Sequence, residues 1–529
     1  MLSRNNLSRL ASVFLAVLCL PVIAQKAAPP PVKTAAVKGI VTNSVTGQPV
    51  ARAHVVINGS SSRVYGAITT SDGRFSMLAV PPGTYSVTAS CRGYQGSISF
   101  PSTPQITVMA GEAPGDVVIK LAPWAVISGQ VVDEMNRPVS NAWVEVIGED
   151  SRGGALSDDL GRFRIAGLSS SRFLVKARNN ESLPPEIRTD GTVQVNYGAT
   201  YYPSALSPES AAPVTTHAGH ETADIIIKMK PAPLVRVRGA VTGNPPEDTG
   251  VSLAIGSETG SSRIALDTMN RFSLWGLDPG RHTLFARWNS GNKTLRSGPT
   301  TVYVADTNID NLVVALMPPF ALGGKIAAEH TLSKADQEAW PAQYRKLLVV
   351  PAEGLSNPRA TMRVDIDVSG DFKTPTLWPG TYSFSLQGFP ENTYVKNVES
   401  GSLKLEKGVL DLSGGPPNQP LTLELGTDGG QITGNVLGPD DSPTVARVRL
   451  LLQRSEGYTI LNETMAFNSP YSFTGLPPGK YFLLPLQNWG GASISPEEFA
   501  AIYSGRMEEV EVGSGEKVTK DLKLSDTFQ

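Results

Sequence analysis

Cysteine, histidine and blocks of like charge are scarce in this chain of 529 residues. It contains two cysteines, Cys19 and Cys91, and five histidines. Its 46 basic and 48 acidic residues give a formal net charge of −2, and no Lys/Arg-rich block occurs. A disulfide framework is excluded if the N-terminus is removed, because Cys91 is then alone. The charge balance argues against nucleic acid and anionic membrane as partners.

Long apolar runs are also missing beyond the N-terminus. A run from Leu10 to Leu20 follows two arginines and is too short for a stable membrane span. With small or branched residues up to Ala24, it predicts a signal peptide at 1–24 and export to the periplasm, outer surface or medium. The leucine before Cys19 argues against lipid attachment there. The Pro and Ala of residues 25–35 are typical of a linker.

What the chain does contain is a phrase repeated five times. An aromatic residue is followed five residues later by a branched aliphatic, then by Pro-Gly in most copies, and by a ring at position ten. The first copy reads Phe75, Val80, Pro82, Gly83 and Tyr85. The others begin at Phe163, Phe272, Phe372 and Tyr471, and the copy at Phe163 has two serines in place of Pro-Gly. Repetition of this length indicates repeated domains.

Each copy has the same neighbours in the same order. Upstream is a glycine within an aliphatic run, namely Gly39, Gly129, Gly239, Gly324 or Gly434, and downstream is a short alternating strand. The spacing predicts modules of about one hundred residues, an ordinary size for a β-sandwich. The expected boundaries are 36–122, 123–230, 231–317, 318–426 and 427–529.

The alternation inside each module predicts its fold. In the first, Tyr85, Val87 and Ala89 alternate with polar residues, so one sheet face is apolar and needs a second sheet over it. Asp72-Gly73 favours a tight hairpin with positive φ at both residues. The expected fold class is all-β: five tandem antiparallel sandwiches of the prealbumin or immunoglobulin type, with short helices only in insertions.

Two insertions carry helix signals, and the junctions carry prolines. Pro496 followed by two glutamates predicts a short helix ending near Tyr503, and Ser333 with Asp336 forms a capping box. The junctions, such as Ala122-Pro123-Trp124, predict semi-rigid links and an elongated molecule.

The order of motifs resembles a known family. G-x-V is followed by P-V-x-x-A-x-V at Pro49 to Val55 and at Pro138 to Val144, then by D-G-R-F and L-x-P-G-x-Y. This order resembles the carboxypeptidase regulatory-like domain, a transthyretin-like sandwich found beside zinc carboxypeptidases and in exported bacterial repeat proteins. The resemblance implies an extracytoplasmic accessory module without catalytic residues of its own.

Candidate enzyme and metal sites are sparse, and we expect no cofactor and no metal. His217 and His220 form a local cluster that lacks a third ligand at the required spacing, so a polar loop is expected. Asp158 and Asp159 suit a hairpin turn better than a calcium loop. Cys91 is expected to pack and not to act as a catalytic thiol. A hydrolase site assembled from distant residues stays an alternative.

A covalent crosslink is a further alternative. Some surface adhesin modules that this fold resembles join a lysine to an asparagine or aspartate. Lys38 near the start and Asp116 near the end of the first module are the pair to test, against their interpretation as surface charges.

Binding is the remaining function, and exposed aromatic rings are its candidates. Trp143 is expected on an outward face and Trp378 precedes a Pro-Gly turn, so both are candidate sugar-stacking residues. The alternative is that they lie at interfaces, with Trp275 and Trp288 packed inside their module. We expect an exported non-enzymatic scaffold that binds a protein partner or polysaccharide at the cell envelope. A carbohydrate-binding accessory protein is the alternative.

Overall fold

The computed structural model describes most of the chain and confirms the all-β fold class of five tandem sandwiches. The described residues are 33–59, 63–96, 105–148, 152–179, 189, 195–233, 235–243, 250–256, 261–327, 344–351, 361–405, 408–438, 441–454, 457–467, 469–486 and 496–524. The expected signal peptide, nearly all of the linker and the capping box at Ser333 lie outside them.

Module 1 is a sandwich of two sheets. Its strands are β1 (Ala35–Asn43), β2 (His54–Gly59), β3 (Val64–Ile68), β4 (Arg74–Val80), β5 (Gly83–Ser90), β6 (Gln105–Val108) and β7 (Val117–Leu121). They form one sheet in the order β4-β1-β7 and another in the order β3-β2-β5-β6. Tyr85, Val87 and Ala89 are buried between the sheets, as the alternation predicts.

Module 2 repeats the plan with additions. Its strands are β8 (Ala125–Val132), β9 (Ala142–Ile147), β10 (Arg152–Leu156), β11 (Arg162–Leu168), β12 (Arg172–Asn179), β13 (Val195–Tyr197), β14 (Thr200–Tyr201), β15 (Val214–Thr215) and β16 (Glu221–Lys228), with a 3-10 helix η1 (Pro208–Ser210). The sheets are β11-β8-β16 and β10-β9-β12-β14, and β15 pairs with β12. The junction strand β17 (Pro231–Pro233) pairs with β13.

Module 3 has the same two sheets. Its strands are β18 (Arg236–Thr242), β19 (Val251–Gly256), β20 (Ser261–Ile264), β21 (Arg271–Trp275), β22 (Gly280–Ser290), β23 (Lys293–Arg296), β24 (Thr300–Val304) and β25 (Ile309–Ala315). They are ordered β21-β18-β25 and β20-β19-β22-β23, and β24 pairs with β22.

Modules 4 and 5 complete the chain. Module 4 has β26 (Gly323–Ile326), β27 (Lys346–Pro351), β28 (Met362–Asp365), β29 (Asp371–Lys373), β30 (Thr381–Gln387), β31 (Tyr394–Ser400), β32 (Leu403–Lys404), β33 (Val409–Asp411) and β34 (Leu421–Gly426), in sheets β29-β26-β34-β31-β32 and β28-β27-β30-β33. Module 5 has β35 (Gly430–Gly434), β36 (Val436–Leu437), β37 (Ala446–Arg454), β38 (Gly457–Ala466), β39 (Tyr471–Leu476), β40 (Gly479–Leu486), β41 (Glu508–Val512), β42 (Lys517–Thr519) and β43 (Leu522–Lys523). Its sheets are β39-β35-β42, β36-β43 and β38-β37-β40-β41.

The insertion of module 5 contains the helix that the sequence predicts. Helix α2 (Pro496–Tyr503) starts at the expected proline, carries two glutamates in its first turn and ends at the expected tyrosine. The 3-10 helix η6 (Ser504–Arg506) follows it. No helix among the described residues has the length and apolar character needed to cross a membrane.

In each module the opening strand pairs in parallel with the closing strand, which differs from the antiparallel sandwich expected, and in module 5 this pairing is divided between β35–β42 and β36–β43. In module 1 the closing strand β7 pairs with the opening strand β1 in parallel, from Gly39–Val117 to Asn43–Leu121. The same pairing joins β8 to β16, β18 to β25, β26 to β34 and β35 to β42. Parallel strands need a long crossover, and here the rest of each module supplies it.

The repeated glycine lies where the sheet leaves no room for a side chain. A Cβ on Gly39 would overlap the carbonyl oxygen of Val117 and would lie 2.7 Å from Cε1 of Phe75. The equivalent positions Gly239 and Gly324 are crowded by the phrase phenylalanine and by the closing strand in the same way. In modules 1, 3 and 4 the glycine therefore makes room for both the phrase aromatic and the closing strand.

The ring at position ten of the phrase forms a hydrogen bond back to the chain. The hydroxyl of Tyr85 donates to the Pro81 carbonyl oxygen, 2.9 Å away, and Tyr382 and Tyr481 donate to the carbonyl four residues before them. In module 3 the Nε2 of His282 lies 2.7 Å from the Asp278 carbonyl oxygen. The ring thus locks the Pro-Gly turn.

Module 2 shows how this bond is replaced. Its ring is Phe173, which has no donor. The hydroxyl of Thr216 donates instead to the Ser169 carbonyl oxygen at 2.7 Å, and it accepts from the backbone N–H of Ser171 at 3.1 Å. Thr216, the residue directly after β15, therefore takes the place of the missing tyrosine hydroxyl.

The hairpin before the phrase is a three-residue turn, not the two-residue turn expected. Only Gly73 has a positive φ, of 72°, so the prediction that Asp72 shares it is wrong. The Thr70 N–H donates to the Arg74 carbonyl oxygen and the Gly73 N–H donates to the Thr70 carbonyl oxygen, which places the glycine at the left-handed position of a longer turn.

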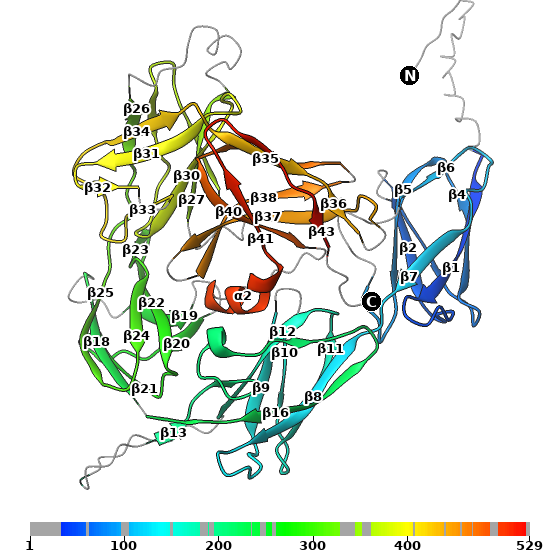
Figure 1. Ribbon diagram of the computed structural model, residues 1–529, viewed down its shortest axis with the longest axis horizontal. Coiled ribbons are helices and arrows are strands. Elements are labelled where there is room, and N and C mark those ends of the chain that lie inside the picture. Colours follow the sequence, from blue (N-terminus) through cyan, green and yellow to red (C-terminus); the bar gives the residue numbers. More distant parts are fainter. Residues whose placement is uncertain are drawn as a thin grey trace, which may run out of the picture.

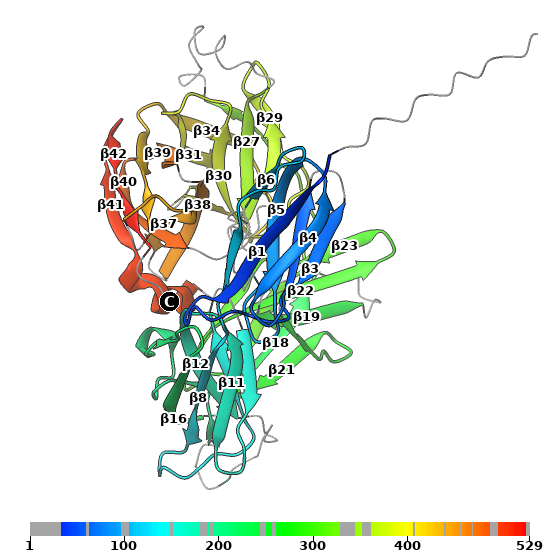
Figure 2. The same ribbon diagram turned by 90° about the vertical axis from the view of Figure 1, so that its right-hand side faces the viewer.

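Modules 2 to 5 form a closed ring, so the expected elongated shape is wrong for this part of the chain. Figure 1 shows these four modules around a common centre that contains α2, with module 1 outside the ring. Figure 2 views the molecule from the side on which module 1 lies, with β1 and β4 toward the viewer. The two ends of the ring, modules 2 and 5, share a cluster of buried apolar residues. The proline-containing junctions therefore bend the chain.

Candidate functional site

The interface between modules 2 and 5 closes the ring and has its own cluster of buried apolar residues. This cluster takes residues from strands β9, β12 and β14 of module 2 and the loop after β14, and from the strands and α2 of module 5. The members are Ile147, Leu174, Tyr201, Ala205, Leu451, Phe482, Leu484, Leu486, Phe499, Ile502 and Tyr503. We call this set the closure cluster.

Alternation explains how the closure cluster is built. Along β40, Tyr481 and Leu483 point into the core of module 5, whereas Phe482 and Leu484 point to the other face and into the closure cluster. Leu174 does the same on β12 of module 2. On β12, Leu174 shares its face with Arg172 and Lys176, whereas β40 is apolar on two faces. This pattern is the sequence signal of the interface, and the predictions above did not use it.

Polar contacts surround the closure cluster. The Tyr201 hydroxyl donates to Oε1 of Glu498 on α2 at 3.2 Å. Burial, together with the Glu498 carboxylate, raises the pKa of Tyr201 well above its usual range. On the same helix Glu497 forms an ion pair of 3.0 Å with Arg281 of β22. Helix α2 therefore contacts modules 2, 3 and 5 together.

Neighbouring modules contact one another around the rest of the ring. The N–H of Ala199 in module 2 donates to Oδ1 of Asp278 in module 3 at 2.7 Å. Between modules 4 and 5, the N–H of Gly429 donates to the Asn392 carbonyl oxygen at 2.8 Å, and the Tyr394 hydroxyl donates to Asp428 at 3.2 Å.

The two candidate tryptophans occupy different settings, and neither is fully exposed. Trp143 is half-buried on the outward face of β9, opposite Val144 and Val146, and its ring lies over Gly154 of β10. Trp378 is half-buried at the boundary of modules 3 and 4, where the guanidinium carbon of Arg296 lies 4.4 Å from its ring centroid. The structure does not bring the two rings together into one interface.

The two tryptophans of module 3, Trp275 and Trp288, differ from each other in burial. Trp288 is buried in the module core, as expected. Trp275 is 39% exposed, so the expectation that it packs inside the module is wrong. It is the last residue of β21, on the face opposite the core residue Phe272.

The remaining candidate residues mainly support local structure. His217 and His220 are exposed with ring centroids 6.5 Å apart, and the described residues include no group of three or more His, Cys, Asp or Glu side chains arranged to hold a metal ion. Asp158 caps the expected hairpin by accepting from the N–H groups of Leu160 and Arg162. Cys91 is half-buried and packs against the core of module 1.

The proposed crosslink pair consists of exposed residues. Lys38 points to solvent from β1, and the side chain of Asp116 is 67% exposed, with one oxygen 3.9 Å from Arg74. Both therefore have the setting of surface charges.

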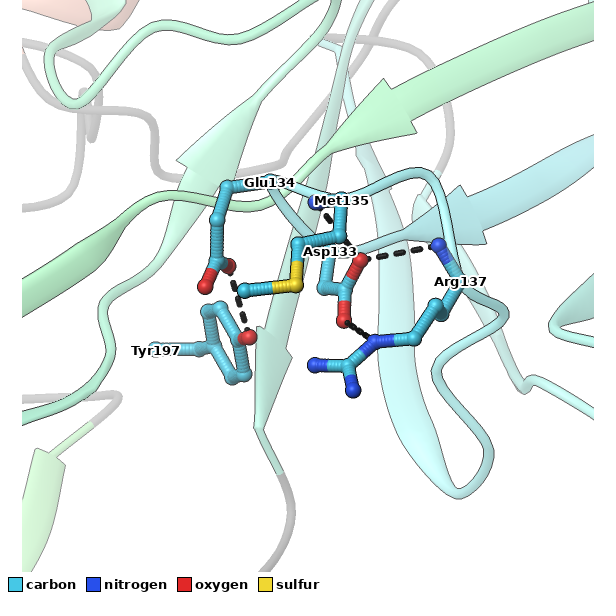
Figure 3. A network of polar contacts seen from close by, with 5 residues as sticks. All are labelled: Asp133, Glu134, Met135, Arg137 and Tyr197. Carbon is cyan, nitrogen blue, oxygen red and sulfur yellow. Dashed lines mark hydrogen bonds and ion pairs between the residues drawn. The ribbon is translucent and has the colours of Figure 1, made fainter.

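A network in module 2 contains a tyrosine with a strongly shifted pKa. Figure 3 shows Asp133 accepting from the backbone N–H groups of Met135 and Arg137 and from Nε of Arg137, while the Tyr197 hydroxyl donates to Glu134 at 2.7 Å. Burial and the Glu134 carboxylate raise the pKa of Tyr197 to about 12. A phenol shifted in this direction is a poor nucleophile or base, so the network clamps a turn.

Module 4 has an open groove of about 920 Å³ beside β28 and β29. Its acids include Asp367 and Asp371, which both accept from the Ser369 hydroxyl. Asp367 also accepts from two backbone N–H groups, and these hydrogen bonds lower its pKa. The carboxylate is thus held ionised in a turn and is unsuited to act as a general acid.

The comparisons with known proteins identify one domain. Residues 36–122 match the carboxypeptidase regulatory-like domain family, which confirms the resemblance for module 1. No curated protein matches the chain significantly.

Solved structures with partial similarity include two pilins. The minor pilin of Streptococcus agalactiae shares 13% identity over 38% of this chain and 97% of its own, with a TM-score of 0.23. The major pilin subunit of Bacillus cereus shares 10% identity over 76% of this chain and 99% of its own, with a TM-score of 0.14. At these values no property of the pilins is transferred to this chain.

Proposed function

We propose that this protein is an exported, non-enzymatic scaffold of the cell envelope in which modules 2 to 5 form a rigid ring and module 1 is held outside it. The domain boundaries are those expected from the sequence: 36–122, 123–230, 231–317, 318–426 and 427–529, after a signal peptide at 1–24. The partner is a protein or polysaccharide of the envelope.

The closure cluster is the observation that carries the proposal. Separate modules on flexible links would each keep a polar outer face, whereas Leu174, Phe482 and Leu484 are apolar and buried between two modules. A chain that commits such residues to an internal contact has a fixed geometry, and fixed geometry is what a scaffold requires.

The chemistry of the polar residues supports a non-enzymatic role. The acids with lowered pKa values, such as Asp133, Asp267 and Asp367, accept hydrogen bonds in turns. The tyrosines with raised pKa values, such as Tyr201 and Tyr471, are buried donors. The family that matches module 1 is also an accessory module by resemblance.

The role of Trp143 and Trp378 in binding sugar stays a proposal. For Trp378, the guanidinium of Arg296 above its ring favours a contact between modules 3 and 4. Trp143 retains an outward ring on β9 and is the better of the two candidates for a neutral sugar.

Small-angle X-ray scattering on the mature chain tests the ring. Wild type is expected to scatter as a compact ring with an attached arm. Leu174→Glu places a charge in the closure cluster and is expected to open the ring and raise the radius of gyration. Ile226→Glu, at an exposed position of the same module, is the control and should leave the curve unchanged. An extended wild-type chain, or turnover of ester, peptide or glycoside substrates, would contradict the proposal.

A further inference from the structure

One outward sheet face differs from its counterparts in the other modules. The sheet β21-β18-β25 of module 3 lies on the outer rim of the ring, whereas β19, β22 and β24 lie nearer its centre (Figure 1). Its inner residues, including Val237, Val241 and Phe272, are buried in the module core. The alternate residues of the same strands therefore face outward.

The register brings an indole and two guanidinium groups together on this face. Arg236 of β18 pairs with Trp275 of β21, and Arg238 pairs with Ser273. The guanidinium carbon of Arg236 lies 5.6 Å from the Trp275 ring centroid. Trp275, Ser273 and Arg238 are exposed. We call these four residues the module 3 platform.

The fold does not require these side chains. The slot of Trp275, three residues after the phrase aromatic, holds Leu78 in module 1 and Ala166 in module 2. The slot of Arg236, three residues before the repeated glycine, holds Ala36 and Val126. Since the same sheet forms with small or aliphatic residues there, packing does not explain an exposed indole beside arginines.

The platform has a cation without an acidic partner. Arg236 pairs with Asp310 at 3.3 Å, and its neighbour on the face, Arg271, pairs with Asp267 at 2.8 Å. Within the described part of the chain, the side chain of Arg238 has no carboxylate partner. The platform therefore presents a free, exposed guanidinium group next to an exposed aromatic ring.

We propose that the module 3 platform binds an anionic polysaccharide with carboxylate groups, such as a polyuronate. The apolar face of one sugar ring stacks on Trp275, and Arg238 pairs with the carboxylate of a neighbouring sugar unit. Arg236 orients the indole through its contact with the ring, and the Ser273 hydroxyl is available to a sugar hydroxyl.

The spacing suits this ligand better than an acidic peptide. Trp275 and Arg238 are separated by two residues along the strand and by one strand across, which is about 7 Å by about 5 Å. Consecutive sugar units of a linear chain place a ring face and a carboxylate at such a separation. An acidic peptide would use the arginines but would not need the indole. The dependence on Trp275 therefore separates the two ligands.

Titration calorimetry of the full mature chain with polygalacturonate oligosaccharides tests the proposal. Wild type is expected to bind, with affinity that falls as salt rises because an ion pair contributes. Trp275→Ala and Arg238→Gln are each expected to weaken binding about tenfold or more, which is about 1.4 kcal/mol. Both positions are exposed, so the midpoint temperature of thermal unfolding should be nearly unchanged in both variants. If Trp275→Ala proves unstable, Arg238→Gln still tests the proposal.

The matched control is Leu78→Ala, which changes the same slot in module 1 and should leave binding unchanged. A neutral oligosaccharide of equal length should bind at least tenfold more weakly. Absence of binding at millimolar polygalacturonate, or binding unaffected by Trp275→Ala, would overturn the proposal. If polyglutamate binds as tightly as polygalacturonate and its binding depends on Arg238 but not on Trp275, the platform binds acidic peptides and the polysaccharide proposal is overturned. None of these results depends on ring closure, so they do not test the scaffold proposal.

Discussion

The hydroxyl of Tyr201 in module 2 donates a hydrogen bond to the carboxylate of Glu498 in module 5, across 297 residues of sequence. This contact lies beside the closure cluster and marks where the chain returns to its second module. Four modules thereby become one body. The stability of each then depends on its neighbours, in contrast to independent domains on a string.

Truncation inside the closure cluster should destabilise the ring. Ile502 of α2 is fully buried, and Ile502→Ala is expected to cost about 2–5 kcal/mol of unfolding free energy through lost burial and a cavity. Denaturant unfolding measures this cost. Ile68→Ala, at an exposed strand position of module 1, should change it by less than about 0.5 kcal/mol. Equal effects of the two variants would show that the cluster does not stabilise the ring.

High pH should weaken the same interface. Because burial raises the pKa of Tyr201 in the folded protein, its contribution to stability is present below the unfolded value of 10.0 and is lost as pH rises through the folded value. The midpoint temperature of thermal unfolding should therefore fall more steeply between neutral pH and about pH 11 in wild type than in Tyr201→Phe. Other buried tyrosines titrate in both proteins, so the difference isolates Tyr201. Parallel curves would contradict this expectation.

The repeated glycine should not tolerate a methyl group. Gly39→Ala forces a Cβ against the Val117 carbonyl oxygen and the Phe75 ring, and the expected cost is about 1–3 kcal/mol or more for module 1. Calorimetric unfolding should show it. Gly115 is exposed with open space around its Cβ position, and Gly115→Ala should have almost no effect. A neutral Gly39→Ala would show that the strands move apart easily.

The two hydrogen-bond arrangements that hold the turn of the repeated phrase should contribute different amounts to the free energy of unfolding. Tyr85→Phe removes one hydrogen bond to the Pro81 carbonyl oxygen and should cost about 1 kcal/mol. Thr216→Val removes the buried hydroxyl that both donates and accepts in module 2, and should cost about 1–3 kcal/mol because a buried hydrogen bond to each of two backbone groups is lost. Chemical denaturation measures both. A harmless Thr216→Val would mean that this hydroxyl does not replace the missing tyrosine.

Much of the fold could be predicted from local sequence pattern, because strand alternation and turns depend on residues that are close together in the sequence. Alternation at Tyr85, Val87 and Ala89 gave the buried faces, the Pro-Gly phrases gave the turns, and Pro496 with its glutamates gave α2. The turn at Asp72-Gly73 was assigned one residue too short, since the choice between hairpin types depends on the strand register.

The candidate site was less accessible to sequence reasoning. Trp275 was expected to pack inside module 3, although alternation from Phe272 places it on the outward face. Only the strand register shows that Arg236 lies beside its ring. Phe482 and Leu484 did carry a signal, since they occupy slots that are polar in module 1. That signal shows that a second face is buried but not which module covers it.

The sequence by itself determined the repeated unit, because each sandwich is specified by contacts within about one hundred residues: a glycine under an aromatic, a ring over a turn, a closing strand beside the first. Only the tertiary structure decided that modules 2 to 5 close into a ring. The physical reason is that ring closure depends on the sum of several junction angles and on apolar surfaces far apart in the chain. A local pattern can reveal an apolar surface, as at Phe482 and Leu484, but it encodes neither the junction angles nor the surface that covers it.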